Sequence, residues 1–267
     1  MLDLDTFKTP MVELIQAEVF HDFQTKGYSR PARVTCRRPN GETVEVFVKF
    51  SGGVRNHHLG LTAELVCSRL ARVLGLDTPQ PFIVNLTEEF LEGVPMDAKD
   101  LVWRSLGLNF ASQGAGVGFR VVPTEPRIPV SLRSRAADVF AFDVLIQNFD
   151  RKGDNPNMLW TRESILLIDH ESALKLAFTP QSFNWSTLSL DSFYDHVFYQ
   201  AITSADAGLM KIEDGLRQLG EDGVTSLLAD IPEAWRSHEA GLSLARYLEW
   251  LVGSRTIVCK LIRERIS

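Results

Sequence analysis

The sequence predicts an α+β fold of two lobes, with a β-rich N-terminal lobe over residues 1–100 and a mainly helical lobe over residues 101–267. Two observations carry this prediction. A β-hairpin pattern occupies residues 32–50. Apolar residues at helical spacing dominate the chain from residue 131 onward. A cleft between two such lobes is the natural place for a ligand.

The composition is that of a globular protein with enough apolar material for one large core or two smaller ones. The 267 residues are 45% hydrophobic and 23% charged, which excludes a disordered or fibrous chain. The formal net charge of −6 argues against a general nucleic-acid-binding protein. We therefore expect no direct binding to nucleic acid.

The cysteines and the N-terminus indicate a cytoplasmic protein. The three cysteines, Cys36, Cys67 and Cys259, are too widely spaced for a disulfide framework or a metal knuckle. The N-terminus carries acidic residues where a signal peptide needs positive charge. No apolar run approaches the ~18 residues that a membrane span requires. We expect a soluble cytoplasmic protein that does not act at a membrane.

The N-terminal lobe is expected to begin, after a helical or extended start, with two strands. The runs ARVTCR and TVEVFVKF flank a Pro-Asn-Gly turn at residues 39–41, and Asn-Gly between β-rich runs favours a hairpin because both residues tolerate positive φ. A helix follows, with four leucines on one face between residues 61 and 74 and Gly75 placed to end it. The run PFIVNL predicts another strand, and residues 88–119 show no clear pattern.

The C-terminal lobe opens with an apolar helical pattern over residues 131–149 that leads directly into a polar loop, DRKGDNPN. Two short apolar runs, NMLW and ILLI, then flank a turn and end at Asp169. Beyond residue 182 the pattern is mostly helical. Leu209, Ile212, Leu216 and Leu219 share one face, and Pro232 suits the first turn of another helix.

The polar loop and the turn after it carry the strongest functional pattern. Asp150 and Asn155 form a D-x4-N loop, and Asp169 follows a short apolar strand. Phosphoryl transfer needs one carboxylate near the incoming hydroxyl, together with an amide and a second carboxylate that hold Mg²⁺ on the phosphates of ATP. An Asp-Asn-rich loop alone is often only turn chemistry, but here all three groups occur together.

Two upstream residues complete the set. Lys49 lies on a predicted strand, from which its ammonium can reach the α- and β-phosphates, and Glu64 on the next helix can pair with that ammonium. Taken singly, Lys49 also fits the solvated face of a strand, and Glu64 also fits a surface charge. Their order changes this interpretation, because lysine, glutamate, D-x4-N loop and Asp turn follow one another as a bilobal kinase requires.

The sequences DRKGDN and IDHESAL resemble the catalytic loop and metal-binding turn of the HipA-like kinases, and more distantly those of phosphatidylinositol 3/4-kinases. The resemblance runs from residue 27 to residue 169, with a weaker helical echo through IPEAW. It implies a bilobal protein-kinase-like fold. It also implies these roles: Asp150 as the catalytic carboxylate, Asn155 and Asp169 on Mg²⁺, Lys49 on the phosphates of ATP, and Glu64 in support of Lys49.

The family also places a phosphate-covering loop before the hairpin, and residues 27–31, GYSRP, stand in that place. A plain turn fits these residues equally well, because there is one glycine rather than a Gly-rich run. If the loop binds nucleotide, Ser29 and Arg30 are its candidate binding residues. Relatives are similar in carrying a regulatory serine there, which makes Ser29 a candidate site of autophosphorylation.

The chain departs from the family at Lys152, where members commonly have histidine. A lysine can neutralise charge that develops on the phosphoryl group, so Lys152 is a candidate catalytic residue. It cannot act as a near-neutral acid or base. The chain is also shorter than the best-known toxin kinases of the family, so we expect their dimerising and antitoxin-docking parts to be missing or supplied by a neighbouring protein.

We therefore expect a Mg²⁺-dependent serine/threonine protein kinase that transfers the γ-phosphate of ATP to a protein hydroxyl. The resemblance implies the toxin of a toxin-antitoxin or defence module, a translation component as its protein substrate, and an antitoxin or neighbouring regulatory protein as its partner. Two alternatives stay open. One is a lipid or small-molecule kinase, although the sequence has no basic amphipathic stretch. The other is a catalytically silent module that binds a nucleotide or a partner.

Overall fold

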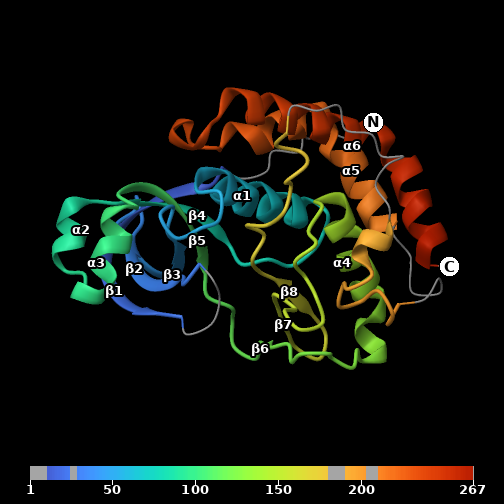
Figure 1. Ribbon diagram of the computed structural model, residues 1–267, viewed down its shortest axis with the longest axis horizontal. Coiled ribbons are helices and arrows are strands. Elements are labelled where there is room, and N and C mark those ends of the chain that lie inside the picture. Colours follow the sequence, from blue (N-terminus) through green and yellow to red (C-terminus); the bar gives the residue numbers. More distant parts are fainter. Residues whose placement is uncertain (1–10, 25–28, 180–189, 203–209, 267) are drawn as a thin grey trace.

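The computed structural model describes residues 11–24, 29–179, 190–202 and 210–266. Within these residues a closed β-barrel is followed by a mainly helical region, with a small three-stranded sheet beside it (Figure 1). The barrel strands are, in chain order, β1 (Glu13–Phe23), β2 (Ala32–Arg37), β3 (Thr43–Lys49), β4 (Pro81–Leu86) and β5 (Gly107–Gln113). Their order around the barrel is β1-β2-β3-β5-β4, and it closes because β1 also pairs in parallel with β4.

The hairpin predicted at residues 32–50 is confirmed. Strands β2 and β3 pair antiparallel from Ala32 opposite Val48 to Arg37 opposite Thr43. Gly41 in the connecting turn has a φ of 88°, a left-handed value that glycine adopts without steric cost. Alternate side chains of both strands fill the barrel interior, which gives the barrel a hydrophobic core of its own.

The predicted helix is α1 (His58–Val73), which lies between the barrel and the helices of the second half (Figure 1). It ends where Gly75 adopts a φ of 73° and its N–H donates to the carbonyl of Arg72 at 3.1 Å. A buried ion pair of 2.9 Å joins Arg69 of α1 to Asp230. Helix α1 thus packs against the barrel on one side and against the helices of the second half on the other (Figure 1), and these contacts fix the position of its side chains.

Residues 88–119, which have no readable pattern, contain two short helices and a barrel strand. These are α2 (Glu88–Glu92), α3 (Met96–Trp103) and β5. Strand β5 pairs antiparallel with both β3 and β4. It lies beyond residue 100, where the sequence placed the boundary between lobes, and this pairing makes it part of the barrel.

The second half contains the remaining elements: β6 (Arg120–Val121), η1 (Val130–Leu132), α4 (Arg133–Leu145), β7 (Met158–Trp160), β8 (Ile165–Leu167), η3 (Leu190–Phe193), α5 (Met210–Ala229), η5 (Glu233–Trp235) and α6 (His238–Ile266). Strands β6, β7 and β8 form the small sheet. Apolar faces of α1, α4, α5 and α6 meet in a second, larger core, which includes Ile212, Leu216 and Leu219 of the predicted face. The fourth residue of that face, Leu209, lies outside the described residues.

One helix boundary differs from the prediction. Pro232 precedes a 3₁₀ turn, and the following α-helix begins only at His238. The backbone of Arg236 is extended, with a ψ of 122°, so the turn cannot continue into that helix. Among the residues that the structure describes, no helix is long and apolar enough to span a bilayer.

Candidate active site

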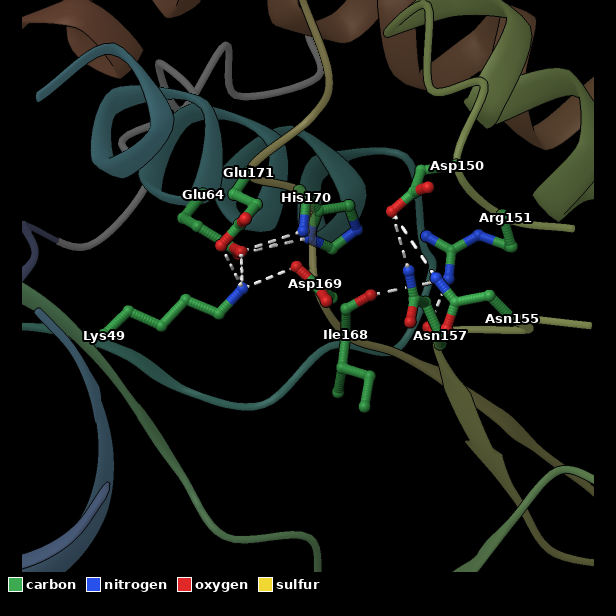
Figure 2. Close-up of polar contacts among 10 residues, drawn as sticks. All are labelled: Lys49, Glu64, Asp150, Arg151, Asn155, Asn157, Ile168, Asp169, His170 and Glu171. Carbon is green, nitrogen blue, oxygen red and sulfur yellow. Dashed lines mark hydrogen bonds and ion pairs between the residues drawn. The ribbon is translucent and has the colours of Figure 1, made fainter. Parts of the chain in front are cut away.

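One lysine and three carboxylates meet where β3, α1 and the residues after β8 come together (Figure 2). Lys49, the last residue of β3, donates from Nζ to Glu64 Oε1 on α1. The same Nζ lies 2.6 Å from Asp169 Oδ1 and 3.3 Å from Glu171 Oε2. The structure therefore brings together Lys49, Glu64 and Asp169, as the sequence order suggested, and adds Glu171.

Lys49 and the carboxylates around it stabilise one another in their charged forms. Burial alone would lower the pKa of Lys49, but the charges of Asp169, Glu64 and Glu171 raise it above its ordinary value. Burial alone would raise the pKa of Glu64, but the Lys49 ammonium and a hydrogen bond from His170 lower it to about 2. Lys49 is thus a fixed cation and Glu64 a fixed anion at neutral pH.

The cluster carries more negative than positive charge. Carboxylate oxygens of Glu64, Asp169 and Glu171 lie within 4.8 Å of one another, and one ammonium faces all three. Burial and the neighbouring carboxylates Asp169 and Glu64 raise the pKa of Glu171, although Lys49 opposes this. An oxygen-rich group of this kind suits a hard divalent cation such as Mg²⁺.

The predicted catalytic carboxylate, Asp150, lies near the lysine cluster (Figure 2). Asp150 is half-buried and accepts long hydrogen bonds from Asn157 Nδ2 at 3.4 Å and Asn155 Nδ2 at 3.5 Å. Burial and then the charge of Asp169 raise its pKa, while Arg55 and other groups lower it. Figure 2 places Asp169 between Lys49 and Asp150. Asp150 therefore lies within electrostatic range of Asp169 in the lysine cluster.

The predicted catalytic loop (residues 150–157) is tied to helix α4 through a buried arginine. The Arg151 side chain is fully buried, and its Nε donates to Asp143 Oδ2 at 2.6 Å. Its guanidinium also donates to the carbonyls of Pro156, at 3.3 Å, and Asn157. Asp143 accepts a further bond from Asn148 Nδ2 at 3.0 Å. The loop that presents Asp150 is thereby closed on itself and fixed to the helix.

Backbone strain is concentrated around this site. Gln147, Asn157 and Asp169 have φ values of 56°, 46° and 62°, in the left-handed region that non-glycine residues rarely adopt. Each such residue costs on the order of 1–3 kcal/mol and persists only where the surroundings enforce it. Gln147 precedes the catalytic loop, Asn157 is its last residue, and the third strained residue is Asp169 itself.

Two other predicted residues lie at the edge of the site. Asn155 is exposed, and its described side-chain contact is with Asp150, so its predicted role at a metal stays a prediction. Lys152 is directed to Asp195, with Nζ 3.9 Å from Oδ2, and 44% of its side chain is exposed. Its charge lowers the pKa of Asp150, which places it within electrostatic range of that carboxylate.

The predicted phosphate-covering loop is described in part. Gly27 and Tyr28 lie outside the described residues. Ser29 is buried and lies close enough to Glu171 to lower the pKa of that carboxyl, so it reaches the lysine cluster. The guanidinium carbon of Arg30 lies 4.4 Å above the centre of the Phe23 ring, which directs this side chain toward the end of β1. Nucleotide binding by Ser29 and Arg30 stays a prediction.

Sequence reasoning missed three residues of the site: Glu171, Arg151 and Asp143. Glu171 follows Asp169 by two positions and Arg151 follows Asp150 directly, so both lie inside the motifs that were recognised. Asp143 gives a weaker sign, a charged residue within the apolar run FAFDVL. Acidic residues are almost never fully buried unless they are paired, so this position alone pointed to a buried partner.

Comparison with known proteins decides the family. A family model described as HipA-like kinase matches residues 18–250 of the 267 residues. The chain belongs to the HipA-like kinase family. The recognition made from DRKGDN and IDHESAL is thus confirmed, and family membership identifies the chain as a kinase, a phosphotransferase.

One solved structure supports the fold. The crystal structure of CtkA, a proinflammatory kinase of Helicobacter pylori, is 14% identical, with 96% of this chain and 98% of CtkA covered and a TM-score of 0.55. This likeness supports a kinase-like α+β fold. The Golgi casein kinase is 13% identical over 98% of this chain and 75% of its own, and 14% identical over 96% and 75% in a structure with Mn/ADP bound. Both give TM-scores of 0.45, too low to add to the comparison. No curated protein sequence matches the chain significantly.

Proposed function

We propose that the chain is a Mg-ATP-dependent serine/threonine protein kinase, in which the barrel and the helical region act as two lobes around the nucleotide. One observation carries the proposal. Lys49, held by Glu64, lies 2.6 Å from Asp169, and Asp150 lies within electrostatic range of Asp169. A charged lysine, its supporting glutamate, a metal-binding aspartate and a catalytic aspartate are the groups that kinases use.

The nucleotide side of the site has a division of labour. Lys49 binds phosphate oxygens of ATP, and Glu64 orients it. Asp169 has 29% of its side chain exposed, against 2% for Glu64 and 6% for Glu171, so it is the carboxylate best able to reach a ligand. Asp169 and Asn155 are the proposed Mg²⁺ ligands. Bound Mg²⁺ would neutralise charge on the phosphates of ATP.

Asp150 serves the acceptor side. The hydroxyl oxygen of the acceptor attacks the γ-phosphorus, the bond between that phosphorus and the β–γ bridging oxygen breaks, and ADP leaves. Asp150 positions the hydroxyl and accepts its proton, and a pKa raised by burial and by Asp169 makes it a better base than an exposed aspartate. Lys152, whose charge reaches Asp150, is proposed to neutralise charge that develops on the phosphoryl group.

The partners form the less direct part of the proposal. Membership in the HipA-like family supports a protein acceptor and the role of a toxin in a toxin-antitoxin or defence module. We propose a translation component as the substrate and an antitoxin or neighbouring regulatory protein as the partner. A cytoplasmic location goes with such a substrate.

Transfer of labelled γ-phosphate tests the proposal. The purified chain is incubated with Mg-ATP, with itself and a cell extract as acceptors, beside Asp169→Asn and the matched control Asp154→Asn. Asp154 is an exposed residue of the same loop. The wild type and the control should label protein, and Asp169→Asn should fall to background. Label in the lipid fraction alone would indicate a lipid kinase. A wild type that binds ATP without transfer would indicate a silent nucleotide-binding module.

A further inference from the structure

We infer that a cavity beside the catalytic loop binds an apolar side chain of the acceptor protein, close to the hydroxyl that receives the phosphate. The cavity has a volume of about 360 Å³, and residues from 148–152 and 192–196 line it. Its volume lies within the range of specific ligand pockets, ~300–1,000 Å³. The inference rests on the proposed function, because it assigns the acceptor side of the same site.

Position is the first reason. Phe149 and Lys152 both line the cavity, and Asp150 lies between them in the chain. The N–H of Lys152 donates to the Asp150 carbonyl at 3.0 Å, so the chain turns tightly at the catalytic carboxylate. An extended peptide spans ~3.3–3.6 Å per residue. Because Phe149 and Lys152 flank Asp150 in the chain and line the cavity, the inferred occupant is a side chain one or two residues from the acceptor hydroxyl.

The surface of the cavity is the second reason. The rings of Phe149 and Phe193 lie 4.7 Å apart between centroids. Phe193 is buried and packs edge-on against Phe140 at 6.1 Å. Phe149 is only half-buried, so part of its ring faces the cavity. Aromatic surface of this kind gains most from an apolar occupant.

The third reason is that the charged residues of the lining, Lys152 and Asp195, already pair with each other. Lys152 and Asp195 face each other across 3.9 Å. The N–H of Phe198 donates to His196 Nδ1 at 3.1 Å, which leaves the proton on Nε2, 2.9 Å from Asp143 Oδ2. Burial lowers the pKa of His196, so this ring is neutral. With no unmatched charge among its described lining residues, the cavity favours an uncharged side chain over an acidic or basic one.

Both walls of the cavity are fixed to one carboxylate. Asp143 accepts bonds from Arg151 in the catalytic loop and from His196 in the opposite wall. The N–H of Val197 also donates to the Arg151 carbonyl at 3.0 Å. Because the walls are held at a set spacing before a substrate arrives, the side chain that binds there does not have to order them.

A peptide library tests the inference. Each peptide has one central serine or threonine with randomised flanking positions, and the full chain phosphorylates the library with γ-labelled Mg-ATP. The wild type should prefer phenylalanine, leucine, isoleucine or methionine over glycine at one flanking position by about tenfold or more. Ser192→Trp, which fills the cavity from its exposed rim, should remove this preference and raise the KM for preferred peptides about tenfold. Ser192→Leu serves the same purpose if the tryptophan variant does not fold.

Gln200→Trp is the matched control, because Gln200 is exposed further along the same segment and does not line the cavity. It should keep the preference. A library that is labelled without an apolar preference, or a preference that survives Ser192→Trp, overturns the inference and leaves the proposed function standing. If the wild type labels neither peptides, nor itself, nor an extract, the proposed function fails and takes the inference with it.

Discussion

Replacing Arg151 with methionine should separate the catalytic loop from helix α4 at a large cost in stability. Both Arg151 and Asp143 have no exposed side-chain surface, and methionine keeps the approximate length of arginine while removing its charge. Asp143 would then remain buried, and its described partners would be His196 and Asn148. The loss of one member of a buried ion pair costs about 3–5 kcal/mol, because the other charge stays in a medium of low polarity.

This cost is large relative to the whole stability of a domain, about 5–15 kcal/mol. For a chain of this size each kcal/mol shifts Tm by about 2–4 °C, so Arg151→Met should melt roughly 6–20 °C below the wild type. Urea unfolding followed by circular dichroism measures the difference directly. Arg33→Met is the control, because Arg33 forms a 2.6 Å pair with Asp22 in which 38% and 50% of the two side chains are exposed. Its cost should stay below about 1 kcal/mol.

A double-mutant cycle separates the ion pair from other effects. Asp143→Leu combined with Arg151→Met removes both buried charges, so the double variant should be more stable than the sum of the two single costs implies. Two results would refute the reasoning: a cost for Arg151→Met below about 1 kcal/mol, or single costs that simply add.

Three further predictions follow from the same geometry. Because the pKa of Glu64 is lowered from 4.5 to about 2, its contribution to stability is present above pH 4.5 and is lost as the pH falls toward 2. Urea unfolding across this range should show the loss in the wild type and little of it in Lys49→Met, and equal slopes would contradict the prediction. Mg-ATP at 100 times the Kd of the wild type should stabilise the wild type by about 2.7 kcal/mol. At the same Mg-ATP concentration Lys49→Met should be stabilised far less, as measured by thermal shift. Gly60→Ala would place a methyl group 2.5 Å from the Arg55 carbonyl oxygen, so it should cost about 1–3 kcal/mol. Gly241→Ala, where a methyl group meets nothing within 4 Å, should be neutral or stabilising, and equal effects of the two would refute the steric reason.

Local sequence was sufficient wherever one short segment determines the structure. The hairpin depends on Asn40 and Gly41, which lie between two β-rich runs. The end of α1 depends on Gly75. The catalytic motifs were readable for a similar reason. Asp150 and Asp169 lie on a loop and a turn whose polar residues interrupt apolar runs, so their chemistry stands out from the surrounding core.

Strand β5 could not be read because its environment is made by distant residues. Asn109, Phe110 and Ala111 are buried in succession, so the alternation typical of a strand is absent. Phe110 joins the core around α1, whereas Ala111 joins the core of the barrel. The buried Asn109 accepts a bond from the N–H of Ser51 at 2.7 Å, 58 residues away in the chain. Because this partner cannot be seen in the sequence, the asparagine is read there as a loop residue.

The site was readable in its outline and not in its contacts. Lys49 reaches Glu171 across 122 positions, and no spacing rule connects the two. The role of Lys152 at the phosphoryl group stays a prediction, and the contact of its side chain with Asp195 could not be read, because Asp195 lies on a segment without a recognisable motif. Asp143 pairs with Arg151 inside the protein, and that contact depends on how α4 meets the catalytic loop.

The rate of phosphate transfer by Asp150→Asn tests the central claim most directly. Transfer of labelled γ-phosphate is measured at saturating Mg-ATP with the best acceptor of the wild type, and the Kd for Mg-ATP is measured in parallel. If Asp150 accepts the proton of the acceptor hydroxyl, the variant should still bind Mg-ATP and transfer phosphate about 10²–10⁴-fold more slowly. A variant that binds Mg-ATP and transfers phosphate within about tenfold of the wild-type rate would contradict the role of Asp150 and the account built on it.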